Sequence, residues 1–144
     1  MDASEYKKYV EKKSPPSPLF LNMIKAFIVG GAICTFGQFL QQLYENTGLD
    51  AEDASGLVSV TLIFISVILT GFGLYSKIAK HAGAGTLVPI TGFANAVSSS
   101  AIESKSEGYI TGVGAKLFTI AGPVIVYGIT AAAVAGTIYY LFSL

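Results

Sequence analysis

The sequence predicts an all-α integral membrane protein with three or four transmembrane helices. The chain of 144 residues is 52% hydrophobic and 12% charged, whereas soluble domains carry about 25% charged residues. Residues 57–76 and 117–142 are uncharged stretches, and each is long enough for the ~20 residues that a bilayer requires. Sixteen glycines accompany them, and glycine is common in membrane helices because it lets two backbones approach closely.

Residues 1–18 are predicted to be a polar tail that precedes a membrane domain of residues 19–144. Lysines and carboxylates are mixed in this tail, and the proline-rich stretch 14–18 should end any helix before the membrane. Tyr6 and Tyr9 would give a helical tail a weak amphipathic face, but a solvated tail is the simpler expectation.

The first two predicted spans are about residues 19–44 and 57–76. Lys25 lies near the start of the first span, where a lysine side chain can reach the interface. Lys77 and Lys80 follow the second span directly.

The distribution of lysines predicts the orientation. The loop 45–56 holds four acidic residues and no lysine, whereas the N-terminal tail and the Lys77/Lys80 segment are rich in lysine. Under the positive-inside rule the lysine-rich sides face the cytoplasm. The N-terminus is therefore predicted to be cytoplasmic, and the acidic loop faces outward.

Residues 82–102 form a shorter, broken or re-entrant segment interrupted by glycine and proline. Pro89 suits the first turn of a half-helix that begins near Val88, and the backbone around it needs protein or a watery cavity at membrane depth. If this segment dips and returns, the last span, about 117–142, runs parallel to the first span. If it crosses fully, the two are antiparallel; we favour the re-entrant interpretation.

The first and last spans share a weak internal repeat. Residues 25–37 and 116–128 align in lysine, phenylalanine, two glycines and an aromatic residue before glycine. Transporters and channels often carry such symmetry, although two glycine-rich helices can also match by chance.

A polar stripe marks the candidate site within residues 82–102. Thr91, Asn95 and Ser98 recur at helical spacing, and Ser99 lies beside them. Polar residues in membrane segments either line a watery path or hydrogen-bond neighbouring helices, and the pattern leaves both open. A second stripe of small residues predicts close helix packing within the chain or between subunits: Gly128, Ala132 and Gly136.

Several function classes have no support. The net charge of zero offers nothing to a nucleic acid. His81 is the only histidine and Cys34 the only cysteine, so a histidine-cluster metal site is excluded. Gly112 to Lys116 lacks the Ser/Thr of a P-loop, and no nucleophile–base constellation is present. We therefore expect no enzyme, cofactor or metal.

Residues 83–95, Gly-Ala-Gly-Thr-Leu-Val-Pro-Ile-Thr-Gly-Phe-Ala-Asn, resemble the signature of the SpoVAC/SpoVAEb family of sporulation membrane proteins. Residues 27–38 and 69–75 are also similar, and the charged tail favours the AC branch. The resemblance implies a subunit of the SpoVA complex in the forespore and spore inner membrane of an endospore-forming bacterium. That complex moves dipicolinic acid with calcium into the forespore and releases it at germination. The AC branch resembles the channel-forming part, responsive to membrane tension, acting with other SpoVA proteins.

The function hypothesis that follows is a solute channel for calcium dipicolinate, within a homo- or hetero-oligomer in the lipid bilayer. A half-helix can direct its positive N-terminus at an anion, so Pro89 would mark that end, and Gly83 and Gly85 would allow close approach. The alternative is a non-conducting scaffold that anchors other SpoVA proteins. The candidate path residues are Gly83, Gly85, Pro89, Thr91, Asn95, Ser98 and Ser99.

Overall fold

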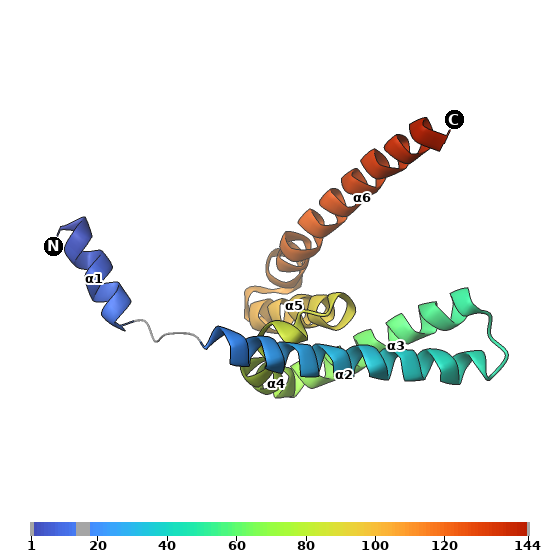
Figure 1. Cartoon of the computed structure of the whole chain (residues 1–144), viewed down its shortest axis with the longest axis horizontal. Helices are drawn as coiled ribbons and strands as arrows, with labels where there is room; N and C mark the ends of the chain where they lie inside the picture. Colours follow the sequence, from blue (N-terminus) through green and yellow to red (C-terminus); the bar gives the residue numbers. More distant parts are fainter. Residues whose placement is uncertain (1, 14–17, 144) are drawn as a thin grey trace.

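A computed structural model describes residues 2–13 and 18–143, and every regular element in these two ranges is helical (Figure 1). The elements are α1 (Ala3–Lys13), α2 (Leu19–Glu45), α3 (Ala51–Gly71), α4 (Leu74–Ala82), the 3-10 helix η1 (Gly83–Thr86), α5 (Pro89–Glu103), the 3-10 helix η2 (Ser104–Glu107), the π-helix η3 (Tyr109–Gly114) and α6 (Ala115–Ser143). Three helical segments are long and apolar enough to cross a membrane: 19–45, 51–71 and 109–143. The predicted all-α membrane class is confirmed.

Helices α2 and α3 form an antiparallel pair (Figure 1). Leu40, Val58 and Leu62 make a small buried cluster between them. Near the turn that joins the helices, the hydroxyl of Tyr44 lies 2.9 Å from that of Thr61. This hydrogen bond satisfies two polar groups that would be costly to leave unpaired in an apolar layer.

Helix α3 differs from the predicted second span, 57–76, at both ends. It begins earlier because Asp50 caps it, accepting a hydrogen bond of 2.8 Å from the backbone N–H of Asp53. Two of the four acidic residues of the predicted loop, Glu52 and Asp53, therefore lie in the first turn of a helix, where the dipole favours negative charge. It ends earlier because Gly73 has a positive φ of 66°, and α4 continues in another direction.

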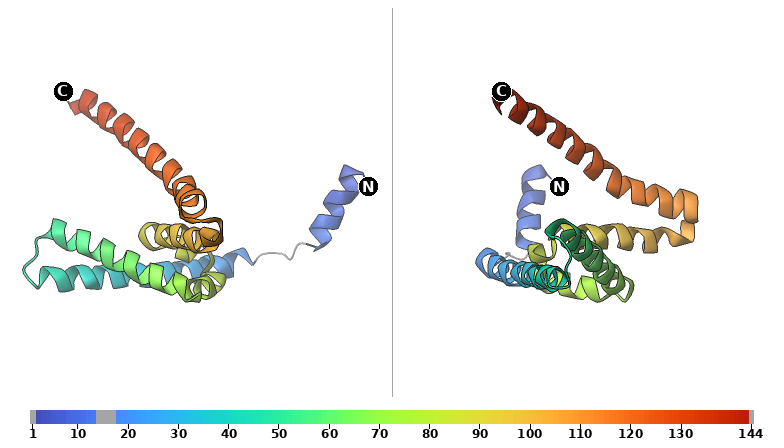
Figure 2. Two further views of the ribbon diagram at one scale, coloured as in Figure 1. Left: turned by 180° about the vertical axis from the view of Figure 1, so that it is seen from behind. Right: turned by 90° about the vertical axis from the view of Figure 1, so that its right-hand side faces the viewer.

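Helix α5 is the half-helix that residues 82–102 predicted, and Pro89 occupies its first position after Val88. Its 15 residues extend only about 22 Å at ~1.5 Å per residue, less than the ~30 Å hydrocarbon core. Figure 2 shows α5 running across the α2–α3 pair before the chain turns into α6. The described residues thus contain three candidate spans, and the short helix α5 packs mainly against α3.

Helix α6 extends away from the other helices (Figures 1 and 2), and none of the residues in its apolar window is buried. The small-residue stripe of Gly128, Ala132 and Gly136 is exposed, and a Cβ on either glycine would meet nothing within 4 Å in the described residues. The described residues therefore offer no helix that packs on this stripe. Packing of the stripe against another subunit stays a prediction.

The internal repeat places its two copies in α2 and α6, and their surroundings differ. A Cβ on Gly37 in α2 would lie 3.6 Å from the side chain of Leu62, whereas one on its counterpart Gly128 in α6 would meet nothing within 4 Å in the described residues. The repeat stays a prediction.

The N-terminal tail contains a helix, α1, where a solvated tail was the simpler expectation. The proline-rich break at 14–18 falls mostly on residues 14–17, which lie outside the described residues, and Pro18 stands at the start of α2.

Candidate functional site

The glycine-rich turn η1 lies against α2. A Cβ on Gly85 would be 2.5 Å from the carbonyl oxygen of Ala26, so only glycine allows this crossing. Gly83 has a φ of 54°, a region that residues with a side chain rarely adopt. At Gly85 the backbone approaches helix α2 closely, whereas a Cβ on Gly83 would meet nothing within 4 Å in the described residues. The approach of an anion to these two glycines stays a prediction.

A buried hydrogen bond holds α4 against the same turn. The hydroxyl of Tyr75 donates to the carbonyl oxygen of Thr86 at 2.8 Å, and both residues are buried. A Cβ on Gly92 would be 2.9 Å from that same carbonyl oxygen, so α5 begins in close contact with η1. These contacts position the start of α5 relative to α4 and η1.

Two side-chain hydrogen bonds join α3 to α5. Ser66, which is only 1% exposed, donates its hydroxyl to the carbonyl oxygen of Thr91 at 2.7 Å. One turn later, the hydroxyl of Thr70 lies 2.8 Å from the side-chain oxygen of Asn95. Asn95 is therefore hydrogen-bonded to the neighbouring helix α3. This is the arrangement expected if the polar stripe joins helices.

Asn95 also lines a polar pocket, and the other interpretation, that it lines a solute path, stays a prediction. This pocket has a volume of about 510 Å³ and lies between α3, α4 and α5; its lining residues are Thr70, Ser76, Ala79, Asn95, Ser99, Ile102 and Glu103. The hydroxyl of Thr70 lies 2.8 Å from the side-chain oxygen of Asn95 and 2.7 Å from the carbonyl oxygen of Ser66, so its one proton is shared between two acceptors. The amide NH₂ of Asn95 can donate two further hydrogen bonds.

The other residues of the predicted stripe divide between different environments. Thr91 lines a second, apolar pocket of about 370 Å³ between α2, α3 and α4. Ser98 donates to the carbonyl oxygen of Ala94 at 2.6 Å and Ser99 to that of Ala96 at 3.2 Å, both within α5. Among the residues of the stripe, only Asn95 and Ser99 line the polar pocket. Pro89, another predicted path residue, is exposed at the start of α5.

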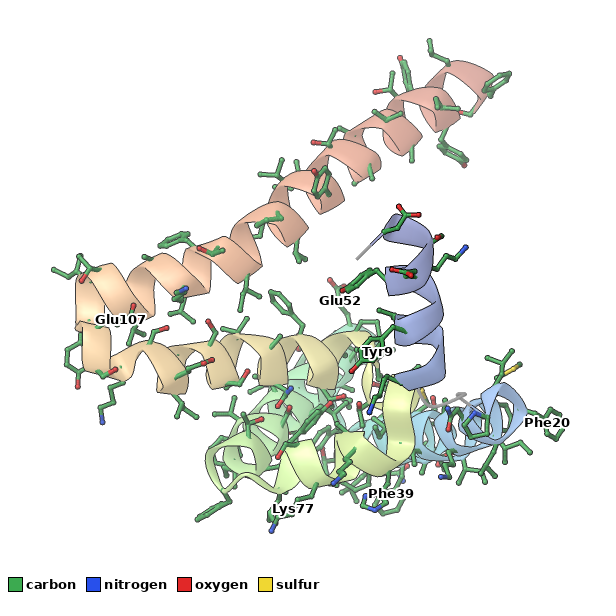
Figure 3. The ribbon with its side chains drawn as sticks, turned by 90° about the vertical axis from the view of Figure 1, so that its left-hand side faces the viewer. Tyr9, Phe20, Phe39, Glu52, Lys77 and Glu107 are labelled. Atoms are coloured by element: carbon green, nitrogen blue, oxygen red, sulfur yellow. The ribbon has the colours of Figure 1, made fainter. Side chains whose placement is uncertain are left out.

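The sequence pattern does not select Thr70, Ser76 or Glu103. Ser66 and Thr70 are polar residues one helical turn apart in a span without charged residues, which is a usable signal for an interhelical contact. Glu103 lines the polar pocket, whereas Glu107 lies at the corner between α5 and α6 (Figure 3).

Comparison with known proteins agrees with the motif around this site. A family model described as SpoVAC/SpoVAEB sporulation membrane protein matches residues 22–138. The chain belongs to this family. It is also 46% identical over 138 residues to stage V sporulation protein AC of Bacillus subtilis (strain 168), a match that covers 95% of this chain and 92% of that protein. No solved structure matches.

Membership of the SpoVAC/SpoVAEB family confirms the resemblance carried by residues 83–95. The family is one of sporulation membrane proteins, which is consistent with three apolar helices long enough to span a bilayer. In this family member, the signature residues build the turn η1 and the first half of α5, the part of the fold that positions Asn95 beside the polar pocket.

Proposed function

We propose that this chain is a solute-conducting subunit of the SpoVA complex in the spore inner membrane, that its N-terminus is cytoplasmic, and that it carries dipicolinic acid with calcium. The observation that carries the proposal is the polar pocket, because its lining includes Asn95 and Ser99 from α5, Thr70 from α3 and Ser76 from α4. Hydrogen-bonding groups between membrane helices need partners, which are neighbouring helices, water or a polar solute.

The carboxylate of Glu103 bears on the form of the solute. Glu103 lines the pocket, and no lysine is among its described lining residues. Dipicolinate carries two carboxylates, which are both ionised near neutral pH, so Glu103 would repel the free dianion. The one-to-one complex with Ca²⁺ is neutral, and its pyridine ring and oxygens suit a wall of amide, hydroxyl and apolar groups. The pocket therefore favours the calcium complex over the free acid.

A scaffold function is the second candidate, and α6 favours it. A candidate span with no buried residue in its apolar window needs lipid or another subunit around it, and an anchoring subunit would present such a helix. Purified chain in liposomes separates the two functions. Solute flux, or single-channel current under applied membrane tension, supports conduction; silence from demonstrably folded protein favours the scaffold.

Asn95 provides the in vivo test. Asn95→Leu removes the amide from the polar pocket, so we expect normal levels of assembled complex but slower dipicolinate uptake and release. Asn95→Asp adds a second negative charge near Glu103. It should slow dipicolinate movement at least as much as leucine does if dipicolinate crosses as the free dianion, and less than leucine does if it crosses as the neutral calcium complex. Spore dipicolinate content and complex abundance are measured together.

Ser98→Val is the matched control, because Ser98 lies on the same helix, bonds Ala94 within α5 and is absent from the pocket lining. It should leave dipicolinate content unchanged. Thr70→Val removes the hydrogen bond to Asn95 while keeping the side-chain shape. If both Thr70→Val and Asn95→Leu lower content only in proportion to lost protein, Asn95 joins helices and does not line the path. Normal content in both Asn95 variants would remove it from the path altogether.

A further inference from the structure

A basic pocket lies at the end of α2 that carries Lys25, and it shares no residue with the polar pocket. Its volume is about 260 Å³, and its lining residues are Asn22, Lys25, Lys80, His81, Ala82, Gly83 and Ala84. The lining combines the first two turns of α2 with the end of α4 and the start of η1.

The fold brings these residues together although they are distant in the sequence. Helix α4 ends at Ala82, and the positive φ of Gly83 turns the chain into η1. Because Gly85 lies directly against Ala26, the last turn of α4 is held next to the start of α2. Lys80 and His81 therefore line the same pocket as Lys25.

The charge of this pocket is unbalanced. Two lysines line it, and no carboxylate is among its described lining residues. Lys80 lies in the last turn of α4, where it offsets the negative end of the helix dipole. Lys25 has no such benefit, because it lies toward the positive end of α2. Since the ends of the two helices oppose each other at the pocket, the lysines determine its sign, and an anion would be stabilised there.

The surroundings of the pocket are those of a lipid headgroup site. Helix α2 is a candidate membrane span, and the apolar side chains near Lys25 on it are exposed, with Leu21 at 49% and Ile24 at 41%. Ile78 on α4 is also exposed, at 42%. A free ion would use only the lysines, whereas a phospholipid places its phosphate beside the lysines and its acyl chains along the apolar flank.

We propose that the basic pocket binds the phosphate of an anionic phospholipid headgroup, with Lys25 and Lys80 as its charge partners. His81 completes the wall. Its Nδ1 lies 2.9 Å from the carbonyl oxygen of Lys77, which can only accept, so Nδ1 carries a proton and the ring is held in place. A lipid bound here would link the start of α2 to α4 and η1.

The test uses the full-length protein purified in detergent, with bound lipid measured by native mass spectrometry during titration with phosphatidylglycerol or phosphatidylcholine. The wild type should prefer phosphatidylglycerol. The double variant Lys25→Gln/Lys80→Gln should bind phosphatidylglycerol at least about tenfold more weakly. The reason is that each lysine near a phosphate contributes about 1 kcal/mol to the binding free energy.

The double variant Lys77→Gln/Lys116→Gln is the matched control, because it removes the same total charge from residues outside the pocket lining; Lys77 projects away from the helices (Figure 3). It should bind phosphatidylglycerol as the wild type does. Equal weakening in both double variants would mean general surface charge and overturn the proposal, as would the absence of any preference in the wild type.

Two further arms separate charge from folding and lipid from free anion. Lys25→Arg/Lys80→Arg keeps the charge, so it should retain phosphatidylglycerol; its failure to do so in folded protein would contradict the assigned role of the lysines. Inorganic phosphate should displace the lipid poorly, because it gains nothing from the apolar flank. Displacement by phosphate at concentrations similar to those of the lipid would show a soluble-anion site and overturn the lipid assignment.

Discussion

Gly85 lies where the backbone of η1 passes the backbone of α2, and the nearest atoms to a Cβ there would be the carbonyl oxygen, Cα and carbonyl carbon of Ala26, at 2.5 to 3.1 Å. These are backbone atoms, so they cannot move aside as the end of a flexible side chain would. A Cβ on Gly31 of α2 would meet no atom of the described residues within 4 Å. The two glycines therefore have different functions although both belong to glycine-rich motifs.

We expect Gly85→Ala to destabilise the protein by about 1–3 kcal/mol, the usual cost of overpacking. Gly31→Ala should leave stability unchanged or slightly higher, because alanine has the better helix propensity. Thermal unfolding of the purified variants in one detergent measures the difference. Equal stabilities for the two variants would show that η1 does not approach α2 as closely as described.

At the scale of single elements, local capping signals decide where the helices begin. Helix α3 starts at Ala51 because the side chain of Asp50 accepts the N–H of Asp53, and two further acidic residues occupy its first turn. Helix α5 starts at Pro89, which needs no N–H partner at that position. Both starts depend on a few consecutive residues. The sequence analysis found the start of α5 but left Asp50 in a loop, because the apolar stretch begins only at Leu57.

Replacing Asp50 tests the cap. Asp50→Ala should lower stability by about 1 kcal/mol because an orphan backbone donor loses its acceptor. Asp50→Asn should retain most of the stability, since an asparagine oxygen caps nearly as well. Circular dichroism during thermal unfolding compares the three proteins. If Asp50→Asn loses as much as Asp50→Ala, the charge of Asp50 matters and the hydrogen bond does not.

At the scale of the whole molecule, the short length of α5 predicts how the three candidate spans are arranged in the membrane. Because α5 has 15 residues and is not a candidate span, α6 should start on the same side of the membrane as the end of α3. Helix α6 then runs parallel to α2, with Lys25 and Lys116 toward the same face. This topology remains a prediction, and the acidic turn between α2 and α3 should lie on the opposite face.

Labelling with an impermeant thiol reagent tests the topology, in a chain whose Cys34 is replaced by serine. Cysteines at Lys77 and Lys105, both exposed positions, should react from the cytoplasmic side. A cysteine at Asp50, also exposed, should react from the other side. Reaction of Lys105→Cys together with Asp50→Cys would mean that α5 crosses the membrane, and reversed reaction of Asp50→Cys and Lys77→Cys would overturn the orientation.

Much of this molecule could be predicted from sequence because the signals are local. Membrane class follows from the hydropathy of continuous stretches, the start of α5 from Pro89, and family membership from residues 83–95. The predicted end of α3 is five residues late, because the apolar character of the chain continues past Gly71 and only the positive φ of Gly73 ends the helix.

The composition of the sites depended on the tertiary structure. Thr91, Asn95 and Ser98 form one pattern in the sequence, yet Thr91 lines the apolar pocket, Asn95 the polar pocket, and Ser98 bonds its own helix. The direction in which α5 crosses α3 decides this division. Lys25 and Lys80 likewise line the same pocket because η1 approaches α2 closely at Gly85. This is a contact between distant segments of the chain, and no local pattern specifies it.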